Sequence, residues 1–254
     1  MTIVTYKGYD KAFQAISTLL RHTKGVILTV YAVDNASGDM TAQRLKEEFP
    51  SIQVIENSKN KGFGYGHNTV IPLLDSDYHV VVNPDITIDR DVITELTNFM
   101  EENPNVGMVT PKICNLDGSD QQLPKRYPTV LALLGRRMFT QRLKKQVEYY
   151  QMKDKDLVTP QCIEYATGCF FMIRTGLFLQ LEGFDKRFFL YYEDIDISRR
   201  AGENSDVVYY PGTYVYHAWE RSSAHKLKYF LILVIGMFKY FNKWGWKLKY
   251  KGID

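Results

Sequence analysis

Apolar and polar positions alternate along the first half of the chain in the rhythm of strands followed by helices. Short apolar runs predict strands at residues 2–6, 26–33 and 52–56. Between them, apolar residues recur at helical spacing and predict helices at residues 9–22 and 40–49. This alternation is typical of parallel βαβ units, in which ligands bind beyond the carboxyl ends of the strands. The pattern therefore predicts an α/β fold.

The second half continues the rhythm less regularly. A turn-rich stretch at residues 114–127 interrupts it and is expected to form a loop over the active site. The helical stretch at 130–150 is basic, which suits either a mobile contact to an anionic acceptor or a solvated face. The remaining predicted elements are strands at 79–82, 106–110, 163–173 and 207–215, and helices at 91–103, 174–181 and 193–202.

Length and composition are those of a globular protein with one substantial core. The chain has 254 residues, of which 45% are hydrophobic and 24% charged. Its three cysteines form an odd set without metal-ligand spacing, which indicates reduced thiols and a cytoplasmic protein. The strand pattern starts at residue 2, so no signal peptide is expected.

Charge is divided unevenly along the chain. Residues 221–254 contain eight Lys and Arg and one acid, whereas residues 1–220 contain 24 bases and 28 acids. Within the tail, the uninterrupted apolar run at 229–238 has about half the length of a membrane-spanning helix. A basic amphipathic helix on an anionic membrane surface is one interpretation, and a core helix packed on the domain is the other. No nucleic-acid-binding motif accompanies the charge, so no nucleic-acid partner is expected.

Three carboxylates, Glu193, Asp194 and Asp196, follow the bulky run at residues 188–192. Acids in the first turn of a helix complement its dipole, so a well-charged helix is the simplest interpretation. Placing three acids behind such a run is costly, however, unless they meet a metal, a cation or a substrate that needs a base. The segment is therefore a candidate catalytic site.

Polar residues also stand at the predicted strand ends. Asp34 follows an apolar run and is expected either to bind a nucleotide base or ribose, or to cap the next helix. Asn83-Pro84-Asp85 follows another run and is expected either to hold a divalent cation or to form a plain turn. The three glycines in residues 60–68 suit a turn against phosphate but match neither the Rossmann fingerprint nor the P-loop.

Four of these segments, taken in order, resemble motifs of the family 2 glycosyltransferases of GT-A fold, particularly the rhamnosyltransferase-like branch. The resemblance covers about residues 2–223. It implies a Rossmann-like, mostly parallel mixed sheet flanked by helices, with a nucleotide-binding half at about 1–110 and an acceptor half at about 111–223. A basic amphipathic helical tail at 224–254 would follow. The four segments are residues 33–37, 60–68, 83–85 and 183–196.

The resemblance also implies roles for individual residues. Asp194 corresponds to the catalytic base, and Asp85 and His217 to ligands of Mg²⁺ or Mn²⁺, although a lone histidine is more often structural. Asn83 stands where the family usually has a second acid. The residues expected to bind nucleotide are Thr5, Tyr6, Asp34, Asn35, Lys61 and Gly62, and those expected at the sugar or acceptor are Asn68, Gly168 and Glu193. Gly168 is equally suited to simple packing.

The function implied is inverting transfer of a sugar, with dTDP-L-rhamnose as the expected donor. The acceptor would be a hydroxyl of a lipid-linked glycan in bacterial cell-surface polysaccharide synthesis, on the inner face of the cell membrane. Alternatives are a UDP-hexose donor and a nucleotide-sugar-binding protein without transfer activity. A nucleotidyltransferase is disfavoured because Tyr6-Lys7-Gly8 is too short for its glycine- and base-rich first loop. The sequence leaves the oligomeric state open.

Overall fold

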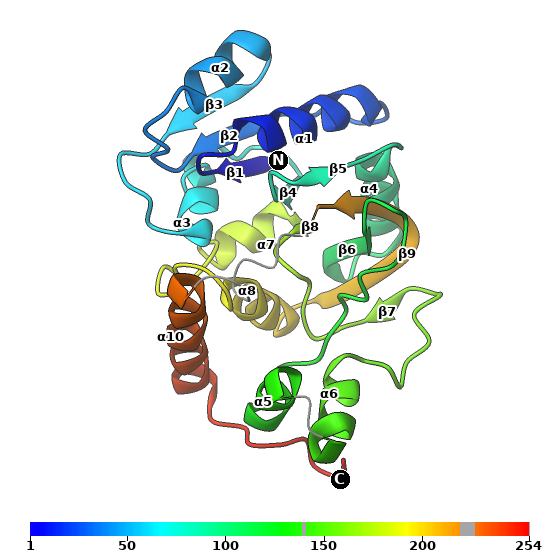
Figure 1. Ribbon diagram of the computed structural model, residues 1–254. Helices are drawn as coiled ribbons and strands as arrows, with labels where there is room; N and C mark the ends of the chain where they lie inside the picture. The colour runs from blue at the N-terminus through cyan, green and yellow to red at the C-terminus, as the bar shows by residue number, and fades with distance from the viewer. Residues whose placement is uncertain (139–140, 219–226, 254) are drawn as a thin grey trace.

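The computed structural model describes residues 1–138, 141–218 and 227–253 and shows a mixed, mostly parallel sheet flanked by helices (Figure 1). The strand order is β3-β2-β1-β4-β8-β6-β9-β5, with β7 paired to β9. Six strands run in one direction, and β5, β7 and β8 run against them. The strands are β1 (Thr2–Thr5), β2 (Tyr31–Asp34), β3 (Gln53–Glu56), β4 (Tyr78–Val82), β5 (Ile86–Thr87), β6 (Val106–Cys114), β7 (Gln161–Cys162), β8 (Phe170–Arg174) and β9 (Asp206–His217).

Helices cover both faces of the sheet. In β4, Val80 and Val82 enter the core shared with α1 and α4, whereas Val81 enters the core shared with α7 and α8. Because neighbouring strand residues point to opposite faces, burial on both faces explains the continuous apolar runs in the sequence. The helices are α1 (Tyr9–His22), α2 (Thr41–Glu48), α3 (Phe63–Asn68), α4 (Val92–Glu102), α5 (Val130–Met138), α6 (Lys144–Tyr150), α7 (Thr175–Gln180), α8 (Glu193–Gly202) and α10 (Leu227–Trp244), with short 3₁₀ turns at Ile71–Leu73 and Gln141–Leu143.

Four predicted elements differ from those observed. The strand expected at 106–110 continues to Cys114, because β6 pairs with β9 over that whole length. The strand expected at 26–33 begins only at Tyr31, because the pairing with both neighbouring strands, β1 and β3, begins opposite that residue. The strand expected at 163–173 begins only at Phe170, since the preceding backbone is hydrogen-bonded to side chains of α8. The helix expected at 130–150 is divided into α5 and α6.

The C-terminal helix α10 packs one face on the domain. Tyr240 and Phe241 are buried against α8, and the segment after the helix returns to α5, where Leu131 N donates to Leu248 O (3.0 Å). Figure 1 shows α5, α6 and α10 grouped on the side of the molecule away from α1 and α2. The expected boundary at 223/224 lies outside the described residues. Among described residues, no helix is sufficiently long and apolar to span a bilayer.

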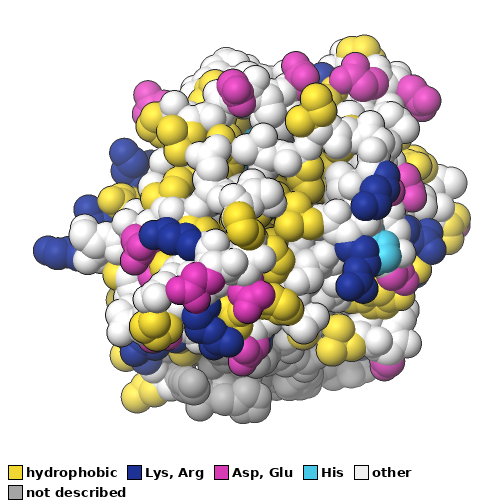
Figure 2. Space-filling view, turned by 90° about the horizontal axis from the view of Figure 1, so that it is seen from above, with side chains coloured by type: hydrophobic (Ala, Val, Ile, Leu, Met, Phe, Trp, Pro, Cys, Tyr) yellow, Lys and Arg dark blue, Asp and Glu magenta, His cyan; other side chains and the backbone are white. Residues whose placement is uncertain are grey.

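The face above α1 and α2 bears charges of both signs. Acidic side chains stand along one rim and also beside the basic side chains, which form small separate groups (Figure 2). Hydrophobic side chains occupy the space between them.

Candidate functional site

Several of the predicted site residues lie at one edge of the sheet. Thr5 and Asp34 end β1 and β2, Asp85 follows β4, and His217 ends β9. These four strands run in the same direction, so their carboxyl ends meet at this edge. Gly168 precedes the antiparallel strand β8 and therefore belongs to the same edge.

Hydrogen bonds to the consecutive residues Gly168 and Cys169 link the segments that carry Asp85 and Asp194. Asn83 N donates to Cys169 O (2.8 Å), and Gly168 N donates to the Asp194 carboxylate (3.1 Å). Burial raises the pKa of the Cys169 thiol to about 12, and the charges of both Asp85 and Asp194 add to that rise. Residues from opposite halves of the chain thus surround one point at the strand edge.

Gly168 allows this approach. A Cβ atom at Gly168 would lie 3.2 Å from Asp194 Cβ and 3.5 Å from the ring of Phe63. The position therefore requires a small residue where the backbone meets the carboxylate. Whether a sugar also contacts Gly168 stays a prediction.

The adjacent carboxyl groups of Glu193 and Asp194 have different environments. Burial raises the pKa of both. Asp194 accepts hydrogen bonds from Gly168 N and Ile195 N, lies near the Lys125 ammonium and remains partly exposed. Glu193 is buried, its Oε2 lacks a partner, and the charge of Asp194 raises its pKa further. Burial and the charge of Asp194 thus both raise the pKa of Glu193, so we expect Asp194 to be the first of the pair to lose its proton.

A strained turn at Tyr191 and Tyr192 precedes Glu193 and Asp194 and sets the position of both residues. Tyr191 and Tyr192 both have φ of 70°, in the left-handed region that bulky residues rarely adopt. Helix α8 starts immediately after them. Gly236 of α10 lies against the turn, and a Cβ there would be 3.0 Å from the Tyr192 ring. The strain is thus held in place by tertiary packing around the carboxylates.

Asp85 and His217 form a second polar group. His217 Nε2 lies 3.3 Å from Asp85 Oδ1, which is buried and accepts no hydrogen bond from any residue that the structure describes. Gln121 Nε2 donates to His217 O (2.8 Å) and to Asn115 Oδ1 (2.9 Å), which fixes the orientation of the Gln121 amide. Gln121 Oε1 therefore faces His217 Nδ1 (3.1 Å), and Nδ1 must carry the proton.

This arrangement suits a cation. The facing Nε2 atom of His217 and Oδ1 atom of Asp85 need positive charge between them, which either a second proton on the ring, forming an ion pair with Asp85, or a bound cation supplies. Imidazole nitrogen and carboxylate oxygen are ordinary ligands of Mn²⁺ and Mg²⁺ respectively, and an outer hydrogen bond to the histidine is usual at metal sites. Within the described residues no cluster of three or more potential ligands occurs, so a metal ion here would need oxygens from a bound ligand or water.

The residues expected to bind nucleotide differ in whether their side chains already form hydrogen bonds within the protein. Among the described residues the buried Thr5 hydroxyl has no hydrogen-bond partner, but it has no exposed surface, whereas the Tyr6 ring is half exposed and accessible. The Asp34 carboxylate accepts from the backbone amide and the hydroxyl of Ser37, three residues on. This bond forms a local turn, and helix α2 begins only at Thr41. The predicted cap of the next helix is therefore wrong for Asp34, and the nucleotide contact stays a prediction.

Asn35 and Gly62 link the end of β2 to the glycine-rich turn at residues 60–68. Asn35 Nδ2 donates to Gly62 O (2.9 Å), and Phe63 N donates to Phe189 O (2.8 Å). Gly62 has φ of 106°, and a Cβ there would overlap Phe189 O. Lys61 is exposed, with its ammonium over the Tyr65 ring. Hence Asn35 and Gly62 join the glycine-rich turn to the segment that carries Asp194.

Asn68 has its amide engaged within the protein. Asn68 Nδ2 donates to Phe184 O (2.7 Å), and Phe184 N donates to Asn68 Oδ1 (2.8 Å). The Asn68 side chain thus fixes the backbone at Phe184, in the segment that leads to α8. A contact between Asn68 and sugar stays a prediction that would need this pair to open.

The sequence pattern did not identify Gln121 or Lys125. Both lie in the loop expected over the site, and Lys125 forms an isolated β-bridge with Tyr165. Single polar residues in a turn-rich loop give no periodic signal, so only the fold relates them to His217 and Asp194.

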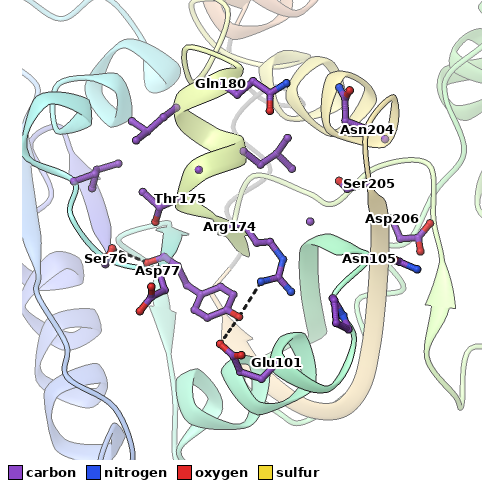
Figure 3. A pocket seen from close by; sticks show the side chains of 18 of the residues that line it. Ser76, Asp77, Glu101, Asn105, Arg174, Thr175, Gln180, Asn204, Ser205 and Asp206 are labelled. Carbon is purple, nitrogen blue, oxygen red and sulfur yellow. Dashed lines mark hydrogen bonds between the residues drawn. The ribbon is translucent and has the colours of Figure 1, made fainter.

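A large hollow lies elsewhere in the described part of the chain. It has a volume of about 1050 Å³ and is lined by the amino end of β4, the start of β6 and β9, and α7 (Figure 3). Arg174 within it donates to the carbonyls of Val106 (2.9 Å) and Met100 (2.7 Å), and thereby supports the fold. These strand ends are opposite to those that carry Asp85 and Asp194.

Comparison with known proteins identifies relatives. The model for glycosyl transferase family 2 matches residues 2–182, a span that ends before Asp194. An N-acetylglucosaminyl-diphospho-decaprenol L-rhamnosyltransferase of Mycobacterium tuberculosis is 28% identical over 231 residues, which cover 84% of this chain and 74% of the relative. The low-salt glycan biosynthesis hexosyltransferase Agl10 of Haloferax volcanii is 26% identical over 78% of this chain and 60% of its own.

Solved structures share the fold at low sequence identity. GalNAc-T7, solved with UDP, GalNAc and Mn²⁺, has a TM-score of 0.65 and 13% identity, over 92% of this chain and 47% of its own. TarS of S. aureus in complex with UDP-GlcNAc has a TM-score of 0.62 and 15% identity, over 95% of this chain and 66% of its own. The chain thus spans about half the length of the GalNAc-T7 structure.

Proposed function

We propose that this chain, which belongs to glycosyl transferase family 2 and is a glycosyltransferase of GT-A fold, transfers its sugar with inversion and uses Asp194 as the base. The observation that carries the proposal is the Asp194 carboxylate, held by two backbone amides at the strand edge beside Asp85. Asp194 takes the proton of the acceptor hydroxyl while the hydroxyl oxygen bonds to the anomeric carbon. The bond from that carbon to the nucleotide diphosphate breaks, and the diphosphate leaves with the electron pair.

Glu193 has a supporting role in this scheme. Its burial and the neighbouring Asp194 charge keep it protonated, so the pair carries one negative charge. A neutral carboxylic acid can donate a hydrogen bond to a sugar hydroxyl, which a second carboxylate could not.

Asp85 and His217 are the residues proposed to hold Mg²⁺ or Mn²⁺. Their facing acceptor atoms support this assignment, and the structural neighbour GalNAc-T7 contains Mn²⁺. When bound, the metal would neutralise charge on the leaving diphosphate. The nucleotide would occupy the edge formed by Thr5, Tyr6 and Asp34.

The donor proposed is dTDP-L-rhamnose, with a UDP-hexose as the alternative. The rhamnosyltransferase relative of Mycobacterium tuberculosis supports the first, and the UDP-GlcNAc complex of the TarS neighbour supports the second. The name of the former also supports a lipid-linked saccharide as acceptor, and a role in cell-surface polysaccharide synthesis stays a prediction.

The test of Asp194 uses the Asp194→Asn variant. It should bind nucleotide sugar as the wild type does, measured by thermal stabilisation with and without Mn²⁺, and lose transfer by 10²-fold or more. Asp206→Asn, at an exposed position on the opposite strand end, is the matched control and should retain transfer. Wild-type protein that binds donors but transfers and hydrolyses none would favour the binding-protein alternative. An Asp194→Asn variant with normal turnover would exclude Asp194 as the base.

We also propose that α10 contacts an anionic membrane surface from the cytoplasmic side. Leu227, Leu231, Ile235 and Phe238 lie on one stripe of the helix and are exposed, opposite to the face that packs on α8. Lysines accompany this stripe within the helix and after it, which suits anionic lipid headgroups.

Vesicle binding tests this surface. The double variant Leu231→Glu/Ile235→Glu changes exposed side chains only, so it should fold normally and lose binding to vesicles with 30% anionic lipid in a sedimentation assay. The control is Leu116→Glu, at an exposed loop position. Equal sedimentation of the two variants and the wild type would contradict the proposed membrane surface.

A further inference from the structure

The chain just before β8 is bonded to two side chains of helix α8. Ala166 N donates to Ser198 Oγ (3.1 Å), and Gly168 N donates to Asp194 Oδ2 (3.1 Å). From Phe170 onward the same chain pairs with β4 as an antiparallel strand. Backbone amides need hydrogen-bond partners, which in a sheet are carbonyl groups of the neighbouring strand. At Ala166 and Gly168 side chains of one helix take that place, so the two bonds link this segment to α8.

Ser198 supplies one of the two attachments. Its side chain is fully buried, and its hydroxyl has a single proton with three acceptors nearby. The carbonyl of Asp194 is the nearest at 2.7 Å, whereas Ala166 O and Met108 Sδ lie at 3.4 and 3.5 Å. The proton therefore points to Asp194 O, and a lone pair of the hydroxyl oxygen accepts from Ala166 N. One hydroxyl thus joins the backbone of both segments.

The Asp194 carboxylate supplies the other attachment. Its Oδ2 accepts from Gly168 N and its Oδ1 from Ile195 N (2.9 Å). Each carboxylate oxygen can accept a further hydrogen bond, so each keeps a lone pair for a ligand. Ile195 belongs to the same helix as Asp194, whereas Gly168 belongs to a segment 26 residues away. The position of Gly168 N therefore depends on contacts that hold its own segment on α8.

The two attachments lie side by side on α8. Asp194 and Ser198 are four residues apart, so they occupy the same face of the helix one turn from each other. They meet amides that are only two residues apart in the other segment. A shift of Ala166 away from Ser198 would consequently move Gly168 relative to Asp194.

Ser205 shows what a serine does when it bonds along its own stretch of chain. Its hydroxyl donates to Ala201 O (3.0 Å), four residues earlier. This back-bonding is common for serine and carries no link to a distant segment. Ser198 forms the same local bond to Asp194 O and in addition accepts from Ala166 N, 32 residues away. The additional bond distinguishes Ser198.

We propose that Ser198 is a positioning residue for Asp194: its hydroxyl holds the Ala166–Gly168 segment on α8 and thereby keeps Gly168 N on the Asp194 carboxylate. The inference rests on the proposed role of Asp194 as the base. With an amide on each oxygen, the carboxylate keeps one orientation toward the acceptor hydroxyl. Loss of the Ser198 bond would let Gly168 N move away and leave the carboxylate with the Ile195 amide, free to turn about its Cα–Cβ bond.

Steady-state kinetics of Ser198→Ala test this role. The donor is dTDP-L-rhamnose or UDP-GlcNAc, whichever the wild type transfers, and the acceptor is decyl diphosphoryl N-acetylglucosamine. We expect kcat to fall about 10- to 100-fold, because small displacements of a reacting group have effects of that size. KM for the donor should change less than about twofold, since the nucleotide is proposed to bind at β1 and β2. Ser205→Ala is the matched control and should retain the wild-type kcat.

Amide hydrogen exchange of the protein without substrates gives a second measurement. In Ser198→Ala the amides of Ala166 and Gly168 should exchange about tenfold faster than in the wild type, because their protection depends on the link to α8. Amides within β8, at Phe171 and Met172, should keep their rates. Ser198→Cys keeps nearly the same side-chain volume and weakens both hydrogen bonds. It serves as the second variant for both measurements if Ser198→Ala does not fold.

The outcomes separate the positioning role from simple stabilisation. Exchange of the Gly168 amide at the wild-type rate, or a kcat equal to that of Ser205→Ala, would overturn the proposal. A rise in donor KM with unchanged kcat would also overturn it. Absence of transfer by the wild type would instead contradict the proposed function. The exchange measurement needs no turnover, so it would still test the link between Ser198 and Gly168.

Discussion

At the scale of single residues, the surroundings of each carboxyl group decide its role. Glu193 and Asp194 are neighbours in the chain, yet Asp194 receives two backbone hydrogen bonds and the field of Lys125, whereas Glu193 Oε2 has no partner. Asp196, two residues further, is buried and bonded to Arg200 of the same helix and to Lys243 of α10. Three acids in one turn thus have three different roles: a proposed base, a neutral acid and a structural ion.

Two buried histidines make stability depend on pH. Burial lowers the pKa of His67 to about 3 and that of His79 well below its ordinary value of 6.5, and neither ring has a hydrogen-bond partner. The unfolded chain therefore binds protons below pH 6.5 that the folded chain does not. We expect the free energy of unfolding to fall by about 1.4 kcal/mol per histidine for each pH unit below 6.5.

Urea unfolding at pH 7, 6 and 5 measures this effect. The His67→Phe variant places an apolar ring between Phe63 and Phe184, where the imidazole lies 4.4 Å and 5.6 Å from the two ring centres. Its loss of stability between pH 7 and 5 should be smaller than that of the wild type by about 2 kcal/mol. Identical pH slopes for the two proteins would show that His67 does not contribute.

At the scale of elements, α8 and α10 form a unit around the site. Lys243 Nζ contacts Asp196 Oδ1 (2.5 Å), Trp244 Nε1 donates to the same oxygen (2.8 Å), and Tyr240 packs on Tyr192. These contacts fix the start of α8 and the strained turn before it. Helix α10 is consequently part of the support of Asp194, with only its outer face available to a membrane.

Removing one member of this unit should be costly. Lys243→Met leaves the buried Asp196 charge with Arg200 and Trp244 alone, so we expect a loss of about 3 kcal/mol in the free energy of unfolding by urea. Lys239→Met, one turn earlier, removes an exposed lysine that donates to Arg187 O and should cost less than about 1 kcal/mol. Similar losses for the two variants would argue against the buried ion pair as the link between the helices.

At the scale of the molecule, one sheet joins the two expected halves. Strand β8 lies between β4 and β6 and pairs with both, so residues from the nucleotide half and the acceptor half are interleaved. The C-terminal segment is bonded to the region of α5 and α6. Tyr250 N donates to Gln146 Oε1 (2.9 Å), and Tyr250 OH donates to Tyr127 O (2.6 Å). The tail therefore contacts both the α8 region and the α5–α6 region.

A chain ending at residue 226 tests the contribution of the tail. It loses the partners of Asp196 on α10 and the packing of Tyr240 and Phe241, so its melting temperature should fall by about 10 °C or more. Differential scanning calorimetry of the truncated and full chains measures the change. Equal melting temperatures would mean that the tail is an appendage and contributes only to membrane contact.

The sequence by itself determined the α/β class, the positions of most helices and strands, and the family. Local periodicity is sufficient for these because burial on one or both faces repeats at fixed spacing along an element. Helix α1 matches its predicted range of 9–22, whereas the strand expected at 26–33 begins only at Tyr31, opposite the first paired residues of β1 and β3. Where the partner strands begin is set by segments elsewhere in the chain and leaves no periodic trace in this one.

Only the tertiary structure decided how the polar residues are used. It placed Gly168 against Asp194, turned Gln121 toward His217, and set the Lys125 ammonium within range of the Asp194 charge. It also divided the tail into a packed face and an exposed face. The physical reason is that the charge state of a side chain and the access of ligands to it depend on neighbours across the fold, and the chain order alone does not specify those neighbours.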